Sequence, residues 1–131
     1  MVADTKGRIL LVEDEAPLRE VFVKALERSG WSVLAYGTAA EALGELSLAP
    51  ESFEAVVADI SLPDFAGRDL LVSRIREVAP RAPLLLMSGS PLPFSLPLRS
   101  AFLQKPFGLG RLLEAVNDLQ RGETEVGPSP T

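Results

Sequence analysis

The sequence predicts an α/β fold in which a parallel β-sheet is covered by helices on both faces. Short apolar runs, each long enough for one buried strand, alternate along the chain with segments whose apolar residues recur at helical spacing. This alternation is typical of parallel strands joined by helical crossovers. The length of 131 residues and the apolar content of 47% fit one globular domain with a buried core.

Each expected strand is an apolar run bounded by charged or turn-forming residues. The first run, Ile9-Leu10-Leu11-Val12, is apolar throughout, as expected of a strand that is buried on both faces. The third run ends at Asp59, and the fourth ends at Ser88-Gly89. The expected strands, in chain order, cover residues 9–12, 31–35, 55–58, 84–87 and 101–103.

The expected helices lie between and after these strands. Gly30 stops the first helix, and Pro80 follows the end of the third. Thr38 and Glu41 form a capping-box pattern that opens the second helix, which runs through about Leu46. The apolar residues that mark the first, third and last helices are Leu18, Val21, Phe22, Ala25 and Leu26; Leu71, Ile75 and Val78; and Leu109, Leu112, Leu113 and Val116.

The segment from Ser90 to Arg99 leaves no room for a regular helix, because three of its residues are proline. Its apolar side chains either cover the core or form an exposed patch for a partner. These side chains are Leu92, Phe94, Leu96 and Leu98. We expect one domain over residues 8–121, with an N-terminal arm over 1–7 and a flexible tail over 122–131.

The composition argues against several classes of site. Cysteine and histidine are absent, so the chain has no disulfide, thiolate nucleophile or phosphoaccepting histidine. Any metal site must be built from oxygen, which favours a hard ion such as Mg²⁺ or Ca²⁺. The formal net charge of -5 argues against nonspecific DNA binding. The apolar runs are too short to span a bilayer and the N-terminus lacks a signal-peptide stretch, which indicates a cytoplasmic location.

Polar residues stand where four of the predicted strands end. Glu13 and Asp14 follow the first strand, Asp59 the third, Ser88 the fourth, and Lys105 comes just after the fifth. In open α/β sheets, functional groups gather at the carboxyl ends of the strands. Clustered carboxylates repel one another and therefore need a cation or raised pKa values. A divalent cation at this edge would leave coordination places for phosphate oxygens, which a lysine and a hydroxyl can also hold.

These strand ends resemble the receiver domains of two-component signalling, over roughly residues 8–119. The matching stretches are Ile9-Leu10-Leu11-Val12-Glu13-Asp14-Glu15, Asp59-Ile60-Ser61-Leu62-Pro63 with Gly67 after it, Met87-Ser88-Gly89, and Phe102-Leu103-Gln104-Lys105-Pro106-Phe107. Each motif alone is weak, whereas all of them in this order are specific. The resemblance implies a single flavodoxin-like, doubly wound domain with a five-stranded parallel sheet in the order 2-1-3-4-5.

The resemblance also implies roles for individual residues. Asp59 is the expected phosphoacceptor nucleophile. The expected Mg²⁺ ligands are the carboxylates of Glu13, Asp14 and Asp59 and the backbone carbonyl of Ser61. Lys105 is similar to the lysine that contacts the phosphate in this family.

Three further expectations concern conformation. Ser88 is similar to the hydroxyl residue that moves toward the phosphoryl group. Phe102 stands where the family has an aromatic switch residue. Receivers also often have a cis bond between the lysine and the following proline, which are here Lys105 and Pro106.

The implied activity is in-line phosphoryl transfer from a phosphohistidine on a histidine kinase or a histidine phosphotransfer protein. Such a domain is a phosphoacceptor and not an enzyme, apart from self-catalysed phosphotransfer and autodephosphorylation. No direct nucleic-acid binding and no membrane insertion are expected, and dimer formation stays open. The stretch from Phe102 to Phe107 also looks like receivers of hybrid sensor kinases, so a stand-alone receiver and a part of a hybrid kinase are both open.

One departure and two alternatives accompany this interpretation. Between Gly89 and Phe102 the family usually has a full fourth helix, which is expected here to be shortened or missing. A pseudo-receiver that binds a partner without phosphorylation is therefore an alternative. The other is an aspartate-nucleophile phosphatase, although such enzymes generally have a second acid at the position that Ser61 occupies. Taken alone, Asp59 would more often be a turn residue and Lys105 a surface lysine.

Overall fold

The computed structural model describes residues 6–64, 67–92 and 94–122. Its strands form one parallel sheet in the order β2-β1-β3-β4-β5, which confirms the predicted topology. The elements are β1 (Gly7–Val12), α1 (Ala16–Arg28), β2 (Trp31–Tyr36), α2 (Ala39–Leu48), β3 (Ala55–Asp59), α3 (Arg68–Val78), β4 (Leu84–Ser88), β5 (Ser100–Gln104) and α4 (Leu109–Gln120). Most of the predicted arm and tail lies outside the described residues.

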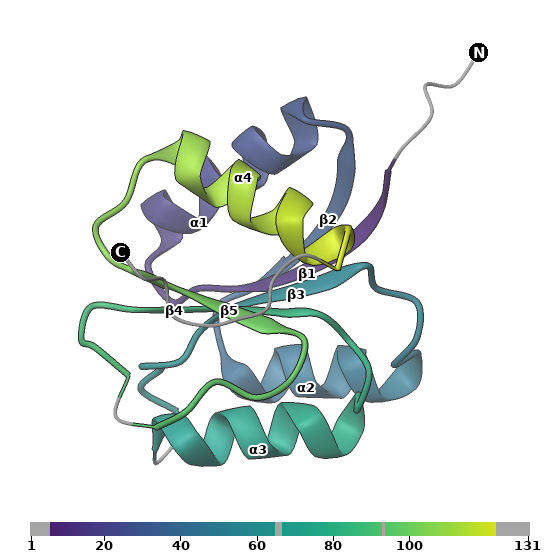
Figure 1. Ribbon diagram of the computed structural model, residues 1–131, viewed down its shortest axis with the longest axis vertical. Coiled ribbons are helices and arrows are strands. Elements are labelled where there is room, and N and C mark those ends of the chain that lie inside the picture. Colours follow the sequence, from purple (N-terminus) through teal and green to yellow (C-terminus); the bar gives the residue numbers. More distant parts are fainter. Residues whose placement is uncertain (1–5, 65–66, 93, 123–131) are drawn as a thin grey trace.

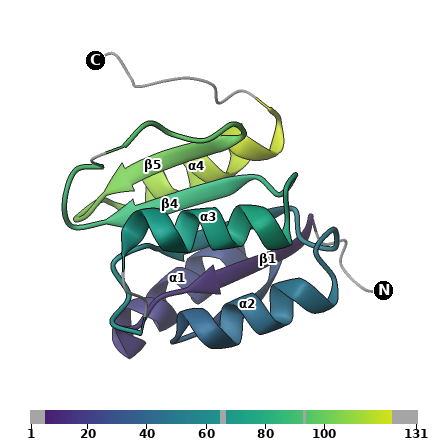
Figure 2. The same ribbon diagram turned by 90° about the horizontal axis from the view of Figure 1, so that it is seen from below.

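The helices cover both faces of the sheet, with α1 and α4 on one face and α2 and α3 on the other (Figure 1, Figure 2). Side chains of β1 alternate between the two layers. Ile9 and Leu11 pack into the cluster beneath α1 and α4, whereas Leu10 and Val12 pack into the cluster beneath α2 and α3. The uniformly apolar sequence of β1 follows from this double burial. No helix in the described part of the chain has the length and apolar character that a bilayer crossing requires.

The N-terminus of α2 is capped from two directions. The Thr38 hydroxyl accepts a hydrogen bond from the Glu41 backbone N–H (3.2 Å), as the capping-box pattern predicts. The Glu41 carboxylate bonds to the Thr38 hydroxyl and not to its backbone N–H. Asp64, from the loop after β3, accepts hydrogen bonds from the N–H groups of Ala39 (3.0 Å) and Ala40 (3.1 Å). This second cap ties the loop that follows Asp59 to α2.

The connection from β4 to β5 contains no helix in its described residues, which confirms the expectation drawn from its prolines. It runs along the face that α2 and α3 cover (Figure 1). Leu92, Phe94 and Leu96 pack partly buried against the core there, in the place that a helix would otherwise cover. Leu98, by contrast, is 86% exposed. Three of the four apolar side chains therefore cover the core, and the fourth lies on the surface.

Arg76 of α3 anchors this connection through backbone carbonyls. Its Nη1 donates to the carbonyl oxygens of Ala82 (2.7 Å) and Ala79 (3.3 Å), and its Nη2 donates to that of Leu98. The guanidinium thus joins the loop before β4 to the segment before β5. Among the described residues, the carbonyls of Ala82 and Leu98 accept no other hydrogen bond, whereas that of Ala79 also accepts from the Ala82 backbone N–H.

We expect Arg76→Ala to lower the free energy of unfolding by about 1–3 kcal/mol, because it leaves the partly buried Ala82 carbonyl without a donor and releases the Leu98 carbonyl. Urea unfolding followed by circular dichroism measures this change. The control is Arg74→Ala on the same helix, which removes only an exposed ion pair with Glu77 and should cost less than about 0.5 kcal/mol. Equal losses in the two variants would show that Arg76 is no anchor.

Candidate functional site

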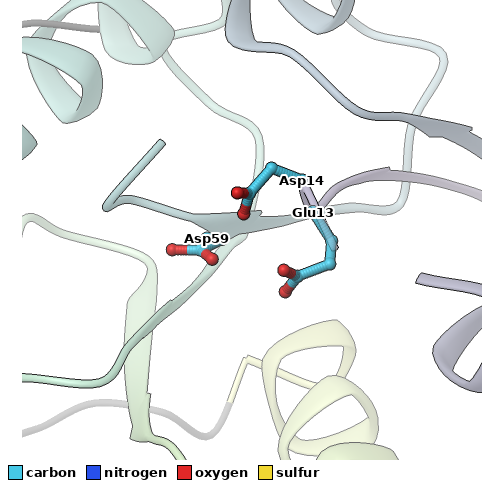
Figure 3. A group of neighbouring side chains, drawn as sticks. All are labelled: Glu13, Asp14 and Asp59. Atoms are coloured by element: carbon cyan, nitrogen blue, oxygen red, sulfur yellow. The ribbon is translucent and has the colours of Figure 1, made fainter. Parts of the chain in front are cut away.

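Three acidic side chains meet at the carboxyl ends of β1 and β3. These strands are neighbours in the sheet, and Val12 pairs with Ala58, so the residues that follow each of them lie side by side. One carboxylate oxygen of each of Glu13, Asp14 and Asp59 lies within 4.8 Å of the others. Figure 3 shows the three carboxylates around a common space, two from the end of β1 and one from the end of β3.

The three acids differ in their access to solvent. Glu13 is fully buried, Asp59 is 5% exposed, and Asp14 is exposed at the mouth of the site. The backbone of Glu13 is held on both sides, because its N–H donates to the Tyr36 carbonyl (3.0 Å) and its carbonyl accepts from Arg19 (2.8 Å). Glu13 is therefore fixed at the floor, whereas Asp14 is the acid that a ligand from solvent meets first.

Lys105 bridges the two buried acids. Its Nζ donates to Glu13 Oε1 (2.7 Å) and to Asp59 Oδ2 (2.9 Å). Its backbone N–H donates to the Ser88 carbonyl (2.8 Å), which fixes the lysine at the end of β4. The Lys105–Pro106 peptide bond is cis, as expected from the motif. The structure thus brings together residues that lie up to 92 positions apart in the sequence.

The charges of the site are out of balance. Burial raises the pKa of Glu13, and the hydrogen bond from Lys105 opposes that rise only in part. Burial also disfavours the charged form of Lys105, but its hydrogen bonds with Glu13 and Asp59 outweigh this, and the pKa of Lys105 is raised. The ammonium therefore stays charged, yet one ammonium faces three carboxylates. This surplus of negative charge on oxygen ligands fits a hard divalent cation.

Ser61 contacts Asp59 through its backbone and contacts Ser88 through its hydroxyl. The backbone N–H of Ser61 donates to Asp59 Oδ1 (2.8 Å), and the Ser61 and Ser88 hydroxyl oxygens are 3.0 Å apart. Ser88 is fully buried at the end of β4, whereas Ser61 is exposed. Both carboxylate oxygens of Asp59 are thus fixed, one by a backbone N–H and the other by the lysine.

Phe102 lies apart from the acids. It pairs with Leu86 in the sheet and packs, partly buried, against the core cluster beneath α2 and α3. Leu92 and Phe94 of the β4–β5 connection pack against the same cluster. Its surroundings are those of a core residue, and its role as a switch stays a prediction.

Arg68, the first residue of α3, belongs to this neighbourhood and was missed by the sequence analysis. Its Nη1 donates to Ser88 Oγ (3.3 Å) and to the carbonyls of Ser90 (3.3 Å) and Pro91 (3.0 Å). The one available signal was a cation in the first turn of a helix, where the helix dipole disfavours positive charge. That signal names no partner, so the contact with Ser88 could not be predicted.

A cavity of about 490 Å³ lies at the other end of the sheet. Its walls come from the loops that precede β3, β4 and β5 and from the end of α4, and include Phe53, Pro83 and Leu119. None of the clustered acids or their partners lines it. The chemistry of the clustered acids is therefore separate from this cavity.

Comparison with known proteins gives one consistent family. The family model of the response regulator receiver domain matches residues 9–117. The response regulator receiver protein CpdR of Brucella abortus is 32% identical over 119 residues, which cover 87% of this chain and 94% of CpdR. The DNA-binding transcriptional regulator NtrC of a Bradyrhizobium species is 32% identical over 116 residues, which cover 84% of this chain but only 23% of NtrC.

Solved structures give the same result. The receiver domain of the hybrid histidine kinase CckA matches with a TM-score of 0.75 and 29% sequence identity. The match covers 87% of this chain and 99% of that domain. The similarity therefore extends over the whole sheet with its helices and is not confined to the acidic cluster.

Proposed function

Because this chain belongs to the family of response regulator receiver domains of two-component systems, we propose that it accepts a phosphoryl group on Asp59 with the help of bound Mg²⁺. Receivers are signalling domains and not classical enzymes. The observation that carries the proposal is the position of Asp59, whose carboxylate lies beside Asp14 and 2.9 Å from Lys105. A nucleophile, a place for a metal and a fixed cation thus lie within one site.

The residues present fit the proposed metal. Glu13, Asp14 and Asp59, with the backbone carbonyl of Ser61, would hold Mg²⁺, which prefers oxygen ligands and usually keeps several waters. When bound, the ion would neutralise charge on the oxygens of the transferring group. We assign Asp14 the most direct contact because it is exposed, whereas Glu13 is buried and already accepts a hydrogen bond from Lys105.

The transfer itself needs little from the protein beyond position and charge. A carboxylate oxygen of Asp59 forms a bond to phosphorus, and the bond from phosphorus to the donor imidazole nitrogen breaks. The electron pair of that bond stays on the nitrogen. Lys105 would stabilise the added negative charge and hold the attacking carboxylate in line.

The donor would be a phosphohistidine on a histidine kinase or on a phosphotransfer protein. Similarity to a receiver domain from a hybrid histidine kinase supports this class of partner. We further propose that the domain spans residues 8–121, that it is cytoplasmic, and that Ser88 and Phe102 change position on phosphorylation. β1 begins at Gly7, one residue before that boundary.

Incubation with acetyl phosphate and Mg²⁺, followed by the mass of the intact protein, tests the proposal. We expect the added mass of one phosphoryl group, which should disappear on addition of a chelator before acetyl phosphate. Turnover of many phosphoesters without a stable adduct would favour a phosphatase. If the protein forms no adduct and shows no turnover, that result would favour a pseudo-receiver and reject the proposed transfer.

Asp14→Asn should weaken Mg²⁺ binding by roughly tenfold or more, because it removes one charge from a site that binds through charge. Titration calorimetry with MgCl₂ measures the affinity. Glu20→Gln is the matched control: it removes an exposed carboxylate from α1, outside the cluster, and should leave the affinity unchanged. An Asp14→Asn protein with wild-type affinity would remove Asp14 from the proposed ligands.

A further inference from the structure

The hydroxyl of Ser88 has a full set of hydrogen bonds. Its oxygen accepts from the Ser90 backbone N–H (3.1 Å) and from Arg68 Nη1 (3.3 Å), and it lies 3.0 Å from the Ser61 hydroxyl. A hydroxyl offers two lone pairs and one proton. Either hydroxyl could donate in the contact between Ser61 and Ser88. The arrangement in which both N–H groups occupy the lone pairs of Ser88 directs its proton at Ser61 Oγ, and in that arrangement Ser88 has no proton available for a group on Asp59.

Arg68 joins this hydroxyl to the backbone after β4. Its Nη1 carries two protons but has three acceptors, Ser88 Oγ and the carbonyls of Ser90 and Pro91, all within 3.3 Å. The protons are consequently shared, and a loss of one acceptor changes the bonds to the other two. Within the described part of the chain, every hydrogen bond of Arg68 comes from this single nitrogen.

The segment that Arg68 holds is the one that replaces a helix. Ser90 and Pro91 lie near the start of the β4–β5 connection, whose apolar residues Leu92 and Phe94 then pack against the core. With no helical hydrogen bonds in its described residues, this connection depends on side-chain donors for its position. Arg68 supplies such a donor at its start, and Arg76 supplies one near its end.

We propose that Arg68 is a positioning residue that couples the orientation of Ser88 to the backbone at Ser90 and Pro91. If Ser88 turns its hydroxyl toward a phosphoryl group on Asp59, it must leave Ser61 and Arg68. The shared protons of Nη1 then redistribute to the two carbonyls, which moves the start of the connection. The coupling rests on the proposed phosphorylation of Asp59, and it makes the β4–β5 connection the part of the surface that reports the state of the site.

The test compares backbone amide NMR spectra before and after phosphorylation by acetyl phosphate and Mg²⁺, with the extent of phosphorylation read from the intact mass. In the wild type, the amides of Ser90 and Leu92 should shift. In Arg68→Met, which keeps the length of the side chain but has no donor, most of this shift should be lost at equal phosphorylation. If Arg68 has a purely structural role, Arg68→Met would alter the spectra of both the unphosphorylated and the phosphorylated protein. The shift on phosphorylation would then be the same as in the wild type.

Two further variants complete the experiment. Arg68→Lys keeps a charged donor and should restore much of the shift, whereas a loss as large as in Arg68→Met would contradict a role through donated hydrogen bonds. Arg111→Ala removes an arginine from the first turn of α4, where it pairs only with exposed Glu114 among the described residues, and should respond as the wild type does. Arg68→Leu, which also has no donor, takes the place of the methionine variant if that protein does not fold.

The outcomes separate the two proposals. A phosphorylated wild type with a full amide response in Arg68→Met would overturn the coupling and leave the phosphoacceptor function intact. A wild type that gains no phosphoryl mass would reject the phosphoacceptor function, and the coupling with it.

Discussion

Asp59→Asn is expected to gain no phosphoryl mass from acetyl phosphate and Mg²⁺, under conditions in which the wild type gains one phosphoryl group. The substitution replaces the carboxylate oxygen that would attack phosphorus by an amide, which is not a useful nucleophile. It conserves the size and shape of the side chain, but the amide nitrogen cannot accept the hydrogen bond that Lys105 Nζ donates to Asp59 Oδ2. The amide oxygen can still accept the hydrogen bond from the Ser61 N–H, so the fold should persist.

Circular dichroism and thermal unfolding check that the variant is folded, and the intact mass measures the effect. Asp69→Asn is the matched control, since it makes the same change at an exposed position in the first turn of α3. That variant should be phosphorylated as the wild type is. Phosphoryl uptake by Asp59→Asn would mean that a different group accepts it, and Asp14 is the nearest exposed carboxylate of the cluster.

The position of Asp59 could be predicted because it depends on local sequence and one topological rule. A buried strand that stops at an acid needs only the apolar run Ala55-Val56-Val57-Ala58 before it. Parallel strands then bring their carboxyl ends to one edge, where Glu13 and Lys105 also arrive. The order of the strands followed from the resemblance to receivers, because an apolar run does not specify its neighbour in a sheet.

The contacts of Arg68, Asp64 and Arg76 could not be predicted for a common physical reason. Each of these side chains binds a backbone group at least 22 positions away in the sequence. A backbone carbonyl or N–H is present at every residue, so the sequence around these partners carries no distinguishing mark. The sequence also does not distinguish a long polar side chain that is solvated from one that is hydrogen-bonded to a distant part of the chain.

The β4–β5 connection was predictable in one respect only. Proline excludes a regular helix wherever it stands in the interior of a segment, so the lack of a helix followed from the sequence. The burial of its apolar residues could not be predicted from the sequence, because an irregular backbone has no period that assigns side chains to a face. Leu96 is partly buried and Leu98 is exposed, although each stands next to Pro97 in the sequence.

Lys105→Ala should lower the free energy of unfolding by roughly 1–3 kcal/mol at neutral pH in the absence of Mg²⁺. The variant leaves fully buried Glu13 and nearly buried Asp59 without the cation that bridges them. The lysine side chain is itself 20% exposed, so water screens part of its interaction and the loss stays below that of a fully buried pair. Lys24→Ala, an exposed lysine of α1, is the control and should cost less than about 0.5 kcal/mol.

Mg²⁺ should reduce the deficit of Lys105→Ala, because an ion that binds only the folded state stabilises it by RT ln(1 + c/Kd), where c is the free Mg²⁺ concentration, and this stabilisation grows as binding becomes tighter. Removing the ammonium makes the acidic cluster more negative, so the ion should bind the variant more tightly than the wild type. Urea unfolding of both proteins with and without MgCl₂ measures this. A deficit that Mg²⁺ leaves untouched would mean that the lysine and the metal do not share the carboxylates of Glu13 and Asp59.

The stability deficit of Lys105→Ala should also depend on pH, and the direction of this dependence follows from the protonation of Glu13. Burial already raises the pKa of Glu13 above its ordinary value of 4.5 in the folded protein, and loss of the hydrogen bond from Lys105 raises it further. A raised folded-state pKa gives a contribution to stability that is present below the unfolded-state pKa and is lost as pH rises through the folded-state value. The deficit of Lys105→Ala relative to the wild type should therefore be small near pH 4.5, where Glu13 can take up a proton, and should grow toward neutral pH. A deficit that stays constant over this range would mean that the lysine acts through packing and not through the charge of Glu13.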